Sequence, residues 1–190
     1  MVTSTFDIRD GGRAAWPRVR RDEIECLRYR LDVVGASAVD VVQSAGGWLY
    51  DRVMAGWQVT VLLPQRSDTR PLRILGVTVS HLDSEFDAPG PGRHSLAVSA
   101  EAFAGDARVR DKVLESLDDR LTEVALWGDG WPLGVNRATT RTQHVLSSAA
   151  RTFKAHALAA AGIDCESVGS TEALRCGASA QVDSELLRLD

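Results

Sequence analysis

Apolar and polar positions alternate along the run IECLRYRLDVV, between Ile24 and Val34. A period of two predicts a strand with one solvated face. Further strands are predicted where short apolar runs are bounded by turn residues, at Gln58–Leu63, Leu72–Val79, Ser95–Ser99 and Thr122–Trp127. The last run, TEVALW, is nearly all apolar, which indicates a strand buried on both faces.

A helical period follows the first strand. Between residues 42 and 57, apolar side chains recur at helical spacing, and most charged residues fall outside that stripe. Ser37 is placed as the N-cap, with Asp40 at the third helical position in a capping-box arrangement. The pair Gly46-Gly47 lies in mid-helix and costs about 1 kcal/mol per glycine relative to alanine. We therefore expect another backbone to approach this helix closely and hold it tight against the sheet.

Three more helices are predicted further along the chain. One is capped by Ser99 or Asp106 and precedes TEVALW. Another runs from about residue 146 to 161 and is closed by Gly162. A short helix is expected near residues 171–176.

This order of elements predicts one α/β or α+β domain over residues 24–176. We expect a layered sandwich with a mixed sheet of about five strands and two main helices. Residues 1–23 are interpreted as an arm or loop, and residues 177–190 as a flexible tail.

Charge and composition argue against nucleic-acid binding and membrane binding. A formal net charge of −4 and a pI of 5.6 supply no field that would attract nucleic acid or an anionic membrane. The chain begins without the features of a secretory signal, and no apolar run is long enough to span a bilayer. We therefore expect a cytoplasmic protein with no membrane partner.

The arm contains four arginines that could form a basic patch for phosphate groups: Arg13, Arg18, Arg20 and Arg21. Asp22, Glu23 and Glu25 follow at once and neutralise much of that charge. Nucleic-acid association is therefore the lowest ranked of three hypotheses.

The cysteines and histidines form no pattern that indicates a metal. Cys26, Cys165 and Cys176 are far apart, and no histidine stands at ligand spacing from them. We expect free buried thiols, no metal site and no cofactor.

The turn Gly35-Ala36-Ser37 joins a strand to a helix N-terminus, where free N–H groups favour an anionic ligand. The chain lacks G-x-G-x-x-G here, and Asp40 in the first turn would repel an anion. A plain capped helix is the favoured interpretation. The order Ser37, Asp129, His144 matches that of α/β-hydrolase triads, but Val39 stands where the nucleophile turn needs a small residue.

The stretch WGDGWP, from Trp127 to Pro132, follows the buried strand TEVALW and opens a segment to residue 143 interpreted as a loop or irregular edge strand. If the strand is parallel to its neighbours, Trp127 and Trp131 could face each other across a pocket. Asp129 would then meet a cation or hydroxyl, with His144 a further candidate. The favoured alternative is a strand-end turn in which both tryptophans cover the core.

Trp16, Trp48 and Tyr50 raise the possibility of an interface. If Trp16 and Trp48 are exposed, they form an apolar patch typical of protein–protein contacts, although a wider buried helix face explains Trp48 equally well. Because no complete catalytic constellation is present, the leading hypothesis is a non-enzymatic, regulatory α/β domain that binds another protein or itself. The alternative is a small-molecule binder or small enzyme with a pocket near Gly35–Ser37 and Trp127–Trp131.

Overall fold

The computed structural model describes residues 29–64, 68–85, 94–119, 122–164, 166–177 and 186–188. These residues form one eight-stranded sheet with the order β3-β2-β1-β4-β5-β7-β6-β8. Its strands are β1 (Arg30–Val34), β2 (Gln58–Leu63), β3 (Thr78–His81), β4 (His94–Ser99), β5 (Glu123–Trp127), β6 (Thr139–Val145), β7 (Thr171–Gly177) and β8 (Leu186–Arg188). Strands β1 to β5 are mutually parallel, whereas β7 is antiparallel to both β5 and β6. The predicted α/β class with a mixed sheet is confirmed, although the estimate of about five strands was too low.

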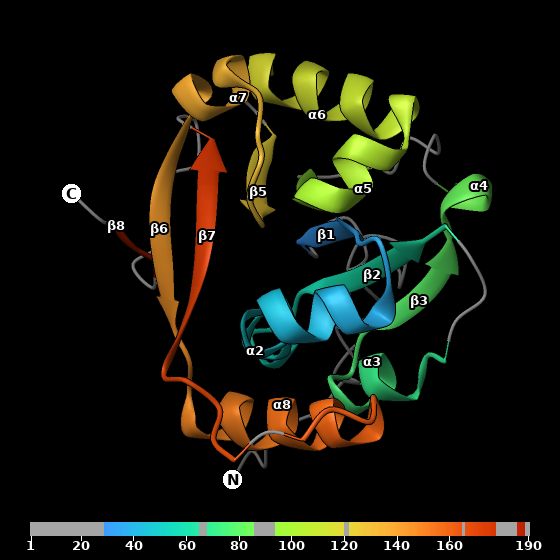
Figure 1. Cartoon of the computed structure of the whole chain (residues 1–190), viewed down its shortest axis with the longest axis vertical. Coiled ribbons are helices and arrows are strands. Elements are labelled where there is room, and N and C mark those ends of the chain that lie inside the picture. Colours follow the sequence, from blue (N-terminus) through green and yellow to red (C-terminus); the bar gives the residue numbers. More distant parts are fainter. Residues whose placement is uncertain are drawn as a thin grey trace, which may run out of the picture.

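Helices cover both faces of the sheet (Figure 1). The helices are α2 (Ala38–Met54), α3 (Arg70–Ile74), α4 (Leu82–Glu85), α5 (Ala100–Gly105), α6 (Ala107–Asp118), α7 (Leu133–Ala138) and α8 (Ser148–Ala160). Helices α2, α3 and α8 lie on one face, and α5, α6 and α7 lie on the other. Within the described ranges, no helix is long and apolar enough to cross a membrane.

Successive residues of the central strands enter different cores. In β5, Ala125 and Trp127 belong to the core under α2 and α8, whereas Val124 and Leu126 belong to the core under α5 and α6. Burial on both faces explains why TEVALW is almost continuously apolar.

Side chains that cap helix N-termini mark the starts of the main helices. The Ser37 hydroxyl accepts from the Asp40 N–H at the start of α2, and Ser99 and Asp106 cap two successive helices, α5 and α6. Ser147 caps α8, which Gly162 follows with a left-handed φ of +74°.

A buried ion pair forms hydrogen bonds with backbone groups in the middle of α2. Lys154 of α8 and Glu172 of β7 lie 2.5 Å apart and are 7% and 4% exposed. The Lys154 ammonium also donates to the Gln43 carbonyl at 2.6 Å, while the Glu172 carboxylate accepts from the Gly47 N–H at 2.9 Å. In a regular α-helix the Gln43 carbonyl and Gly47 N–H would bond to each other. The ion pair therefore supplies each of these two backbone groups with a side-chain partner.

The glycines of α2 are needed for this close approach. A Cβ on Gly47 would lie 2.6 Å from Leu146 Cδ2 and 3.2 Å from the Glu172 carboxylate. Another backbone was expected here, but side chains make the close contacts, Leu146 and Glu172 at Gly47 and Leu75 at Gly46.

Two predicted elements in the middle of the chain differ from the structure. Residues 72–79 were expected to form a strand, but Pro71 lies in the first turn of the short helix α3 and Gly76, at φ +78°, follows that helix. Only Thr78–His81 is strand, as β3. The segment after WGDGWP was expected to be a loop, or a loop with an irregular edge strand, but it forms α7 and the regular strand β6, which lies between β7 and β8.

The structure also differs from the predictions for the C-terminal residues. Residues 171–176 were expected to be helical but belong to β7, where Glu172, Leu174 and Cys176 are buried in strict alternation. Within the expected tail, Leu186–Arg188 forms β8, paired antiparallel with β6. The predicted arm, residues 1–23, and Trp16 within it lie outside the described residues.

Candidate functional site

The parallel strands β1, β4 and β5 end at the same edge of the sheet. The connection after β1 runs to β2 on one side, and the connection after β4 runs to β5 on the other. Ligands of open α/β sheets bind outside the carboxyl ends of strands where the connections diverge in this way. The segments that meet at this edge are the turn 35–37, the start of α5 at residues 100–101 and the turn 128–132.

WGDGWP is a tight turn between the two cores. Gly128 and Gly130 have φ values of +85° and +86°, a region that costs little only for glycine. Trp127 is 2% exposed in the core under α2, whereas Trp131 is 7% exposed in the opposite core, 5.0 Å from the Phe103 ring. The two indoles therefore do not face each other across a pocket. This arrangement corresponds to the favoured interpretation of a strand-end turn.

Side chains of the protein occupy the space around the turn after β1, where a ligand was considered. The Asp40 carboxylate accepts from the Ala36 N–H and from the Trp127 indole N–H, both at 3.0 Å. Asp40 therefore supplies negative charge at the N-terminus of α2, where an anionic ligand was considered. A Cβ on Gly35 would lie only 2.2 Å from Val41, and the Ser37 hydroxyl caps the helix. Gly35 and Ser37 thus have structural roles.

A pocket of about 520 Å³ lies beside the turn at this edge. It is lined by three carboxylates that follow three different strands, Asp40 after β1, Glu101 after β4 and Asp129 after β5, and we call it the carboxylate pocket. Glu101 and Asp129 are exposed, and neither has a hydrogen-bond or ion-pair partner among the described residues.

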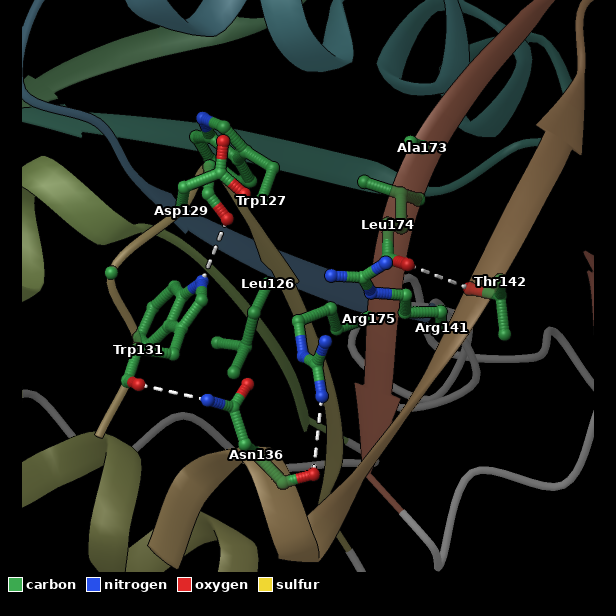
Figure 2. Close-up of a pocket in the computed structure, with 12 residues that line it drawn as sticks. Leu126, Trp127, Asp129, Trp131, Asn136, Arg141, Thr142, Ala173, Leu174 and Arg175 are labelled. Carbon is green, nitrogen blue, oxygen red and sulfur yellow. Dashed lines mark hydrogen bonds between the residues drawn. The ribbon is translucent and has the colours of Figure 1, made fainter. Parts of the chain in front are cut away.

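A second pocket, of about 490 Å³, lies on the other side of the same turn (Figure 2). We call it the arginine pocket, because Arg141 of β6 and Arg175 of β7 both line it. The Arg175 guanidinium donates to Thr139 Oγ1 at 3.0 Å and to the Asn136 carbonyl at 3.1 Å. The Asn136 amide donates in turn to the Trp131 carbonyl at 2.8 Å, which ties α7 to the WGDGWP turn.

Charge and burial act together on Arg175. Partial burial, followed by the positive charge of Arg141, lowers the pKa of Arg175 below its ordinary value. No carboxylate among the described residues forms a hydrogen bond or ion pair with either guanidinium.

His144 lines neither pocket. It is 3% exposed, and its Nε2 lies 2.8 Å from Asp51 Oδ2 on α2, while its Nδ1 has no hydrogen-bond partner in the described part of the chain. Asp51 also accepts from the Ser147 hydroxyl at 2.6 Å, so this cluster joins β6 and α8 to α2. The order Ser37, Asp129, His144 therefore does not correspond to an assembled triad.

The candidate interface residues on α2 are buried. Trp48 is 1% exposed and Tyr50 7% exposed, and Tyr50 stacks on Phe153 with ring centroids 4.6 Å apart. Trp48 and Tyr50 thus belong to a wide buried helix face instead of a surface patch.

Among the residues that the structure describes, no group of three or more His, Cys, Asp or Glu side chains is placed to hold a metal ion. Cys176 is a free, buried thiol, and burial raises its pKa. Cys26 and Cys165 lie outside the described residues.

Asp129, which lines both pockets, was a candidate from the sequence, but most of the other polar lining residues were not. Asp40 was considered only as a helix cap and as a charge that would repel an anion, and Glu101, Asn136, Arg141 and Arg175 were not singled out. Glu101 could have been found from its position directly after a predicted strand. Arg141 and Arg175 are far apart in sequence, and only the pairing of β6 with β7 brings them together.

Among known proteins, solved structures resemble this chain in fold. No protein-family model matches the chain, and no curated protein matches it. A solved deacetylase–teicoplanin complex from teicoplanin biosynthesis matches with a TM-score of 0.52 and 13% identity. A triple mutant of a deacetylase in the teicoplanin biosynthetic pathway matches with a TM-score of 0.51 and 14% identity. Each match covers 85% of this chain and 99% of the other, and at this identity the likeness shows a shared fold.

This likeness contradicts the leading hypothesis from the sequence. A non-enzymatic regulatory or protein-binding domain was expected because no catalytic constellation was recognised, whereas the solved structures that share the fold are deacetylase enzymes. No contiguous motif marks the carboxylates at the sheet edge, because they follow three separate strands.

Proposed function

We propose that this protein is an enzyme that acts on a small molecule bound in the carboxylate pocket. One observation carries the proposal: the pocket lies where the sheet connections diverge and is lined by carboxylates that follow three strands. Its volume of about 520 Å³ is within the range of small-molecule sites.

We propose removal of an acyl group as the reaction, because structures that share the fold are named deacetylases. Asp129 and Glu101 are the candidate acid–base residues, since their carboxylates have no partner among the described residues. One carboxylate would take a proton from water as the water oxygen bonds to the acyl carbon. The carbon–nitrogen bond would then break, and the proton would pass to the leaving nitrogen, which yields acetate and an amine.

The third carboxylate has a positioning role in this proposal. Both Asp40 oxygens already accept hydrogen bonds, one of them from the Trp127 indole at the start of the turn. Asp40 therefore holds the turn that presents Asp129, and Trp127→Phe would be expected to disturb the placement of Asp129 without removing any acid or base.

The test is release of acetate from N-acetylated amino sugars, N-acetyl amino acids and teicoplanin, with the free amine measured in parallel. We expect Asp129→Asn or Glu101→Gln to lower turnover by a factor on the order of 10² to 10⁴. Asp111→Asn is the matched control, because Asp111 is exposed on α6 and lines neither pocket. Absence of turnover on the whole panel, or turnover that survives both substitutions, would overturn the proposal.

Two expectations from the sequence stay as proposals, a cytoplasmic location and binding to another protein or to a second copy of the chain. A cytoplasmic location can be checked by cell fractionation. Binding to another protein or to a second copy can be checked by size-exclusion chromatography, where a mass well above 20.6 kDa would support it.

A further inference from the structure

Two guanidinium groups lie side by side in the arginine pocket. Arg141 of β6 and Arg175 of β7 are directly paired in the antiparallel register, so their side chains leave the sheet on the same face. Figure 2 shows both side chains reaching toward the side of the pocket formed by Leu126 and Asn136. Like charges placed directly opposite each other on paired strands destabilise a sheet.

No protein anion offsets this repulsion in the part of the chain that the structure describes. The hydrogen-bond acceptors of Arg175 are neutral oxygens of Thr139 and Asn136, and no hydrogen bond or ion pair involves the Arg141 side chain. The direction of the Arg175 pKa shift agrees, because burial and Arg141 both lower it and no acid raises it.

One member of the pair, Arg175, is also oriented before any ligand binds. Three hydrogen bonds to neutral acceptors fix the Arg175 guanidinium, and Asn136 is itself held by the Trp131 carbonyl. A guanidinium held in one orientation loses less conformational freedom when it binds carboxylate or phosphate. The adjoining cavity of about 490 Å³ leaves space for the rest of a small molecule.

We propose that Arg141 and Arg175 together bind an oxyanion, a carboxylate or phosphate group, of a small-molecule ligand in the arginine pocket. Arg141 can donate two parallel hydrogen bonds to such a group, and Arg175 can donate from Nη1, since its Nε and Nη2 already bind Thr139 and Asn136. Asp129 lines the same pocket and supplies an acceptor for a hydroxyl or amine elsewhere on the ligand. This site does not require that the protein hydrolyse anything, so it goes beyond the enzymatic proposal.

The test is calorimetric titration of the full chain with inorganic phosphate and, separately, with acetate at matched ionic strength. We expect saturable binding of at least one probe. Arg141→Gln and Arg175→Gln should each raise Kd about tenfold or more, as expected for lost hydrogen bonds to a charged group. The preferred probe distinguishes a phosphate ester from a carboxylate as the natural ligand.

Arg151→Gln is the matched control, because it removes the same charge from an exposed position on α8 that lines neither pocket. We expect it to change Kd by less than about twofold, as is usual for screened surface charge. Arg175→Gln could disturb α7, so the exposed Arg141 provides the second variant, with circular dichroism to verify folding. No saturable binding of either probe, or equal weakening by all three substitutions, would overturn the inference. Phosphate binding without acetate release would uphold it and reject hydrolysis.

Discussion

The ion pair between Lys154 and Glu172 predicts a large loss of stability when only one charge is removed. Glu172→Gln keeps the size of the side chain but leaves the Lys154 ammonium buried without a counter-charge. The amide also cannot replace both acceptor oxygens, which receive the Gly47 N–H at 2.9 Å and the Trp48 N–H at 2.8 Å. The substitution therefore leaves a buried charge unpaired, removes the salt bridge and weakens the hydrogen bonds in the middle of α2.

Removal of one partner of a buried ion pair costs about 3 to 5 kcal/mol. This is a large part of the total free energy of unfolding of a typical domain, about 5 to 15 kcal/mol. For a chain of this length, each kcal/mol lowers Tm by about 2 to 4 °C. The expected fall in Tm is therefore roughly 6 to 20 °C for Glu172→Gln.

Urea unfolding followed by circular dichroism measures this effect, with an unchanged m value as the sign that both states are otherwise similar. Glu115→Gln is the control, because its lysine partner, Lys112, lies 3.0 Å away in an exposed pair. We expect the control to cost less than about 1 kcal/mol. A loss below about 1 kcal/mol for Glu172→Gln would refute the reasoning, since an unpaired buried charge cannot be so cheap.

Three further predictions follow from other contacts. Gly47→Ala should destabilise by about 1 to 3 kcal/mol because its Cβ would lie 2.6 Å from a side-chain carbon, whereas at Gly46 the nearest atom is 3.3 Å away and the loss in urea unfolding should be smaller. Arg141→Gln should raise the free energy of unfolding by about 0.2 to 1 kcal/mol by relieving repulsion with Arg175, and a loss of stability would contradict that. Burial raises the pKa of Cys176, so folding holds its proton and stability should decline as pH rises above about 8.5, through the raised folded pKa. Cys176→Ala should flatten that decline, and identical pH profiles would exclude the effect.

Features that depend on neighbouring residues were predictable from the sequence. Ser37, Ser99, Asp106 and Ser147 each accept a hydrogen bond from a backbone N–H two or three residues further on. Such caps depend only on local sequence, so the helix starts could be located without the fold. The two glycines of α2 indicated close packing, but the prediction that another backbone makes the contact was wrong, because the neighbours are side chains.

Features that depend on strand pairing were not predictable. The run TEALRCG contains good helix formers, and its alternation of buried residues has meaning only once β7 lies between β5 and β6. The buried Glu172 has no partner within its own strand, because Lys154 and the α2 backbone come from other elements. The same holds for the arginine pair, whose register joins residues 34 positions apart.

The change of strand direction beside β5 explains why one turn borders two different pockets. On one side β5 has the parallel neighbour β4, so the chain leaves both strands at the same edge and Glu101 and Asp129 come together. On the other side β7 is antiparallel, with Leu126 opposite Arg175, and it extends beyond the end of β5 toward Thr171. The extended β7 and its partner β6 form a wall from which the two guanidinium groups project.

WGDGWP therefore does not clamp a ligand between its indoles. Its tryptophans anchor the turn in two cores, and its two left-handed glycines let Asp129 border an acidic pocket and a basic one.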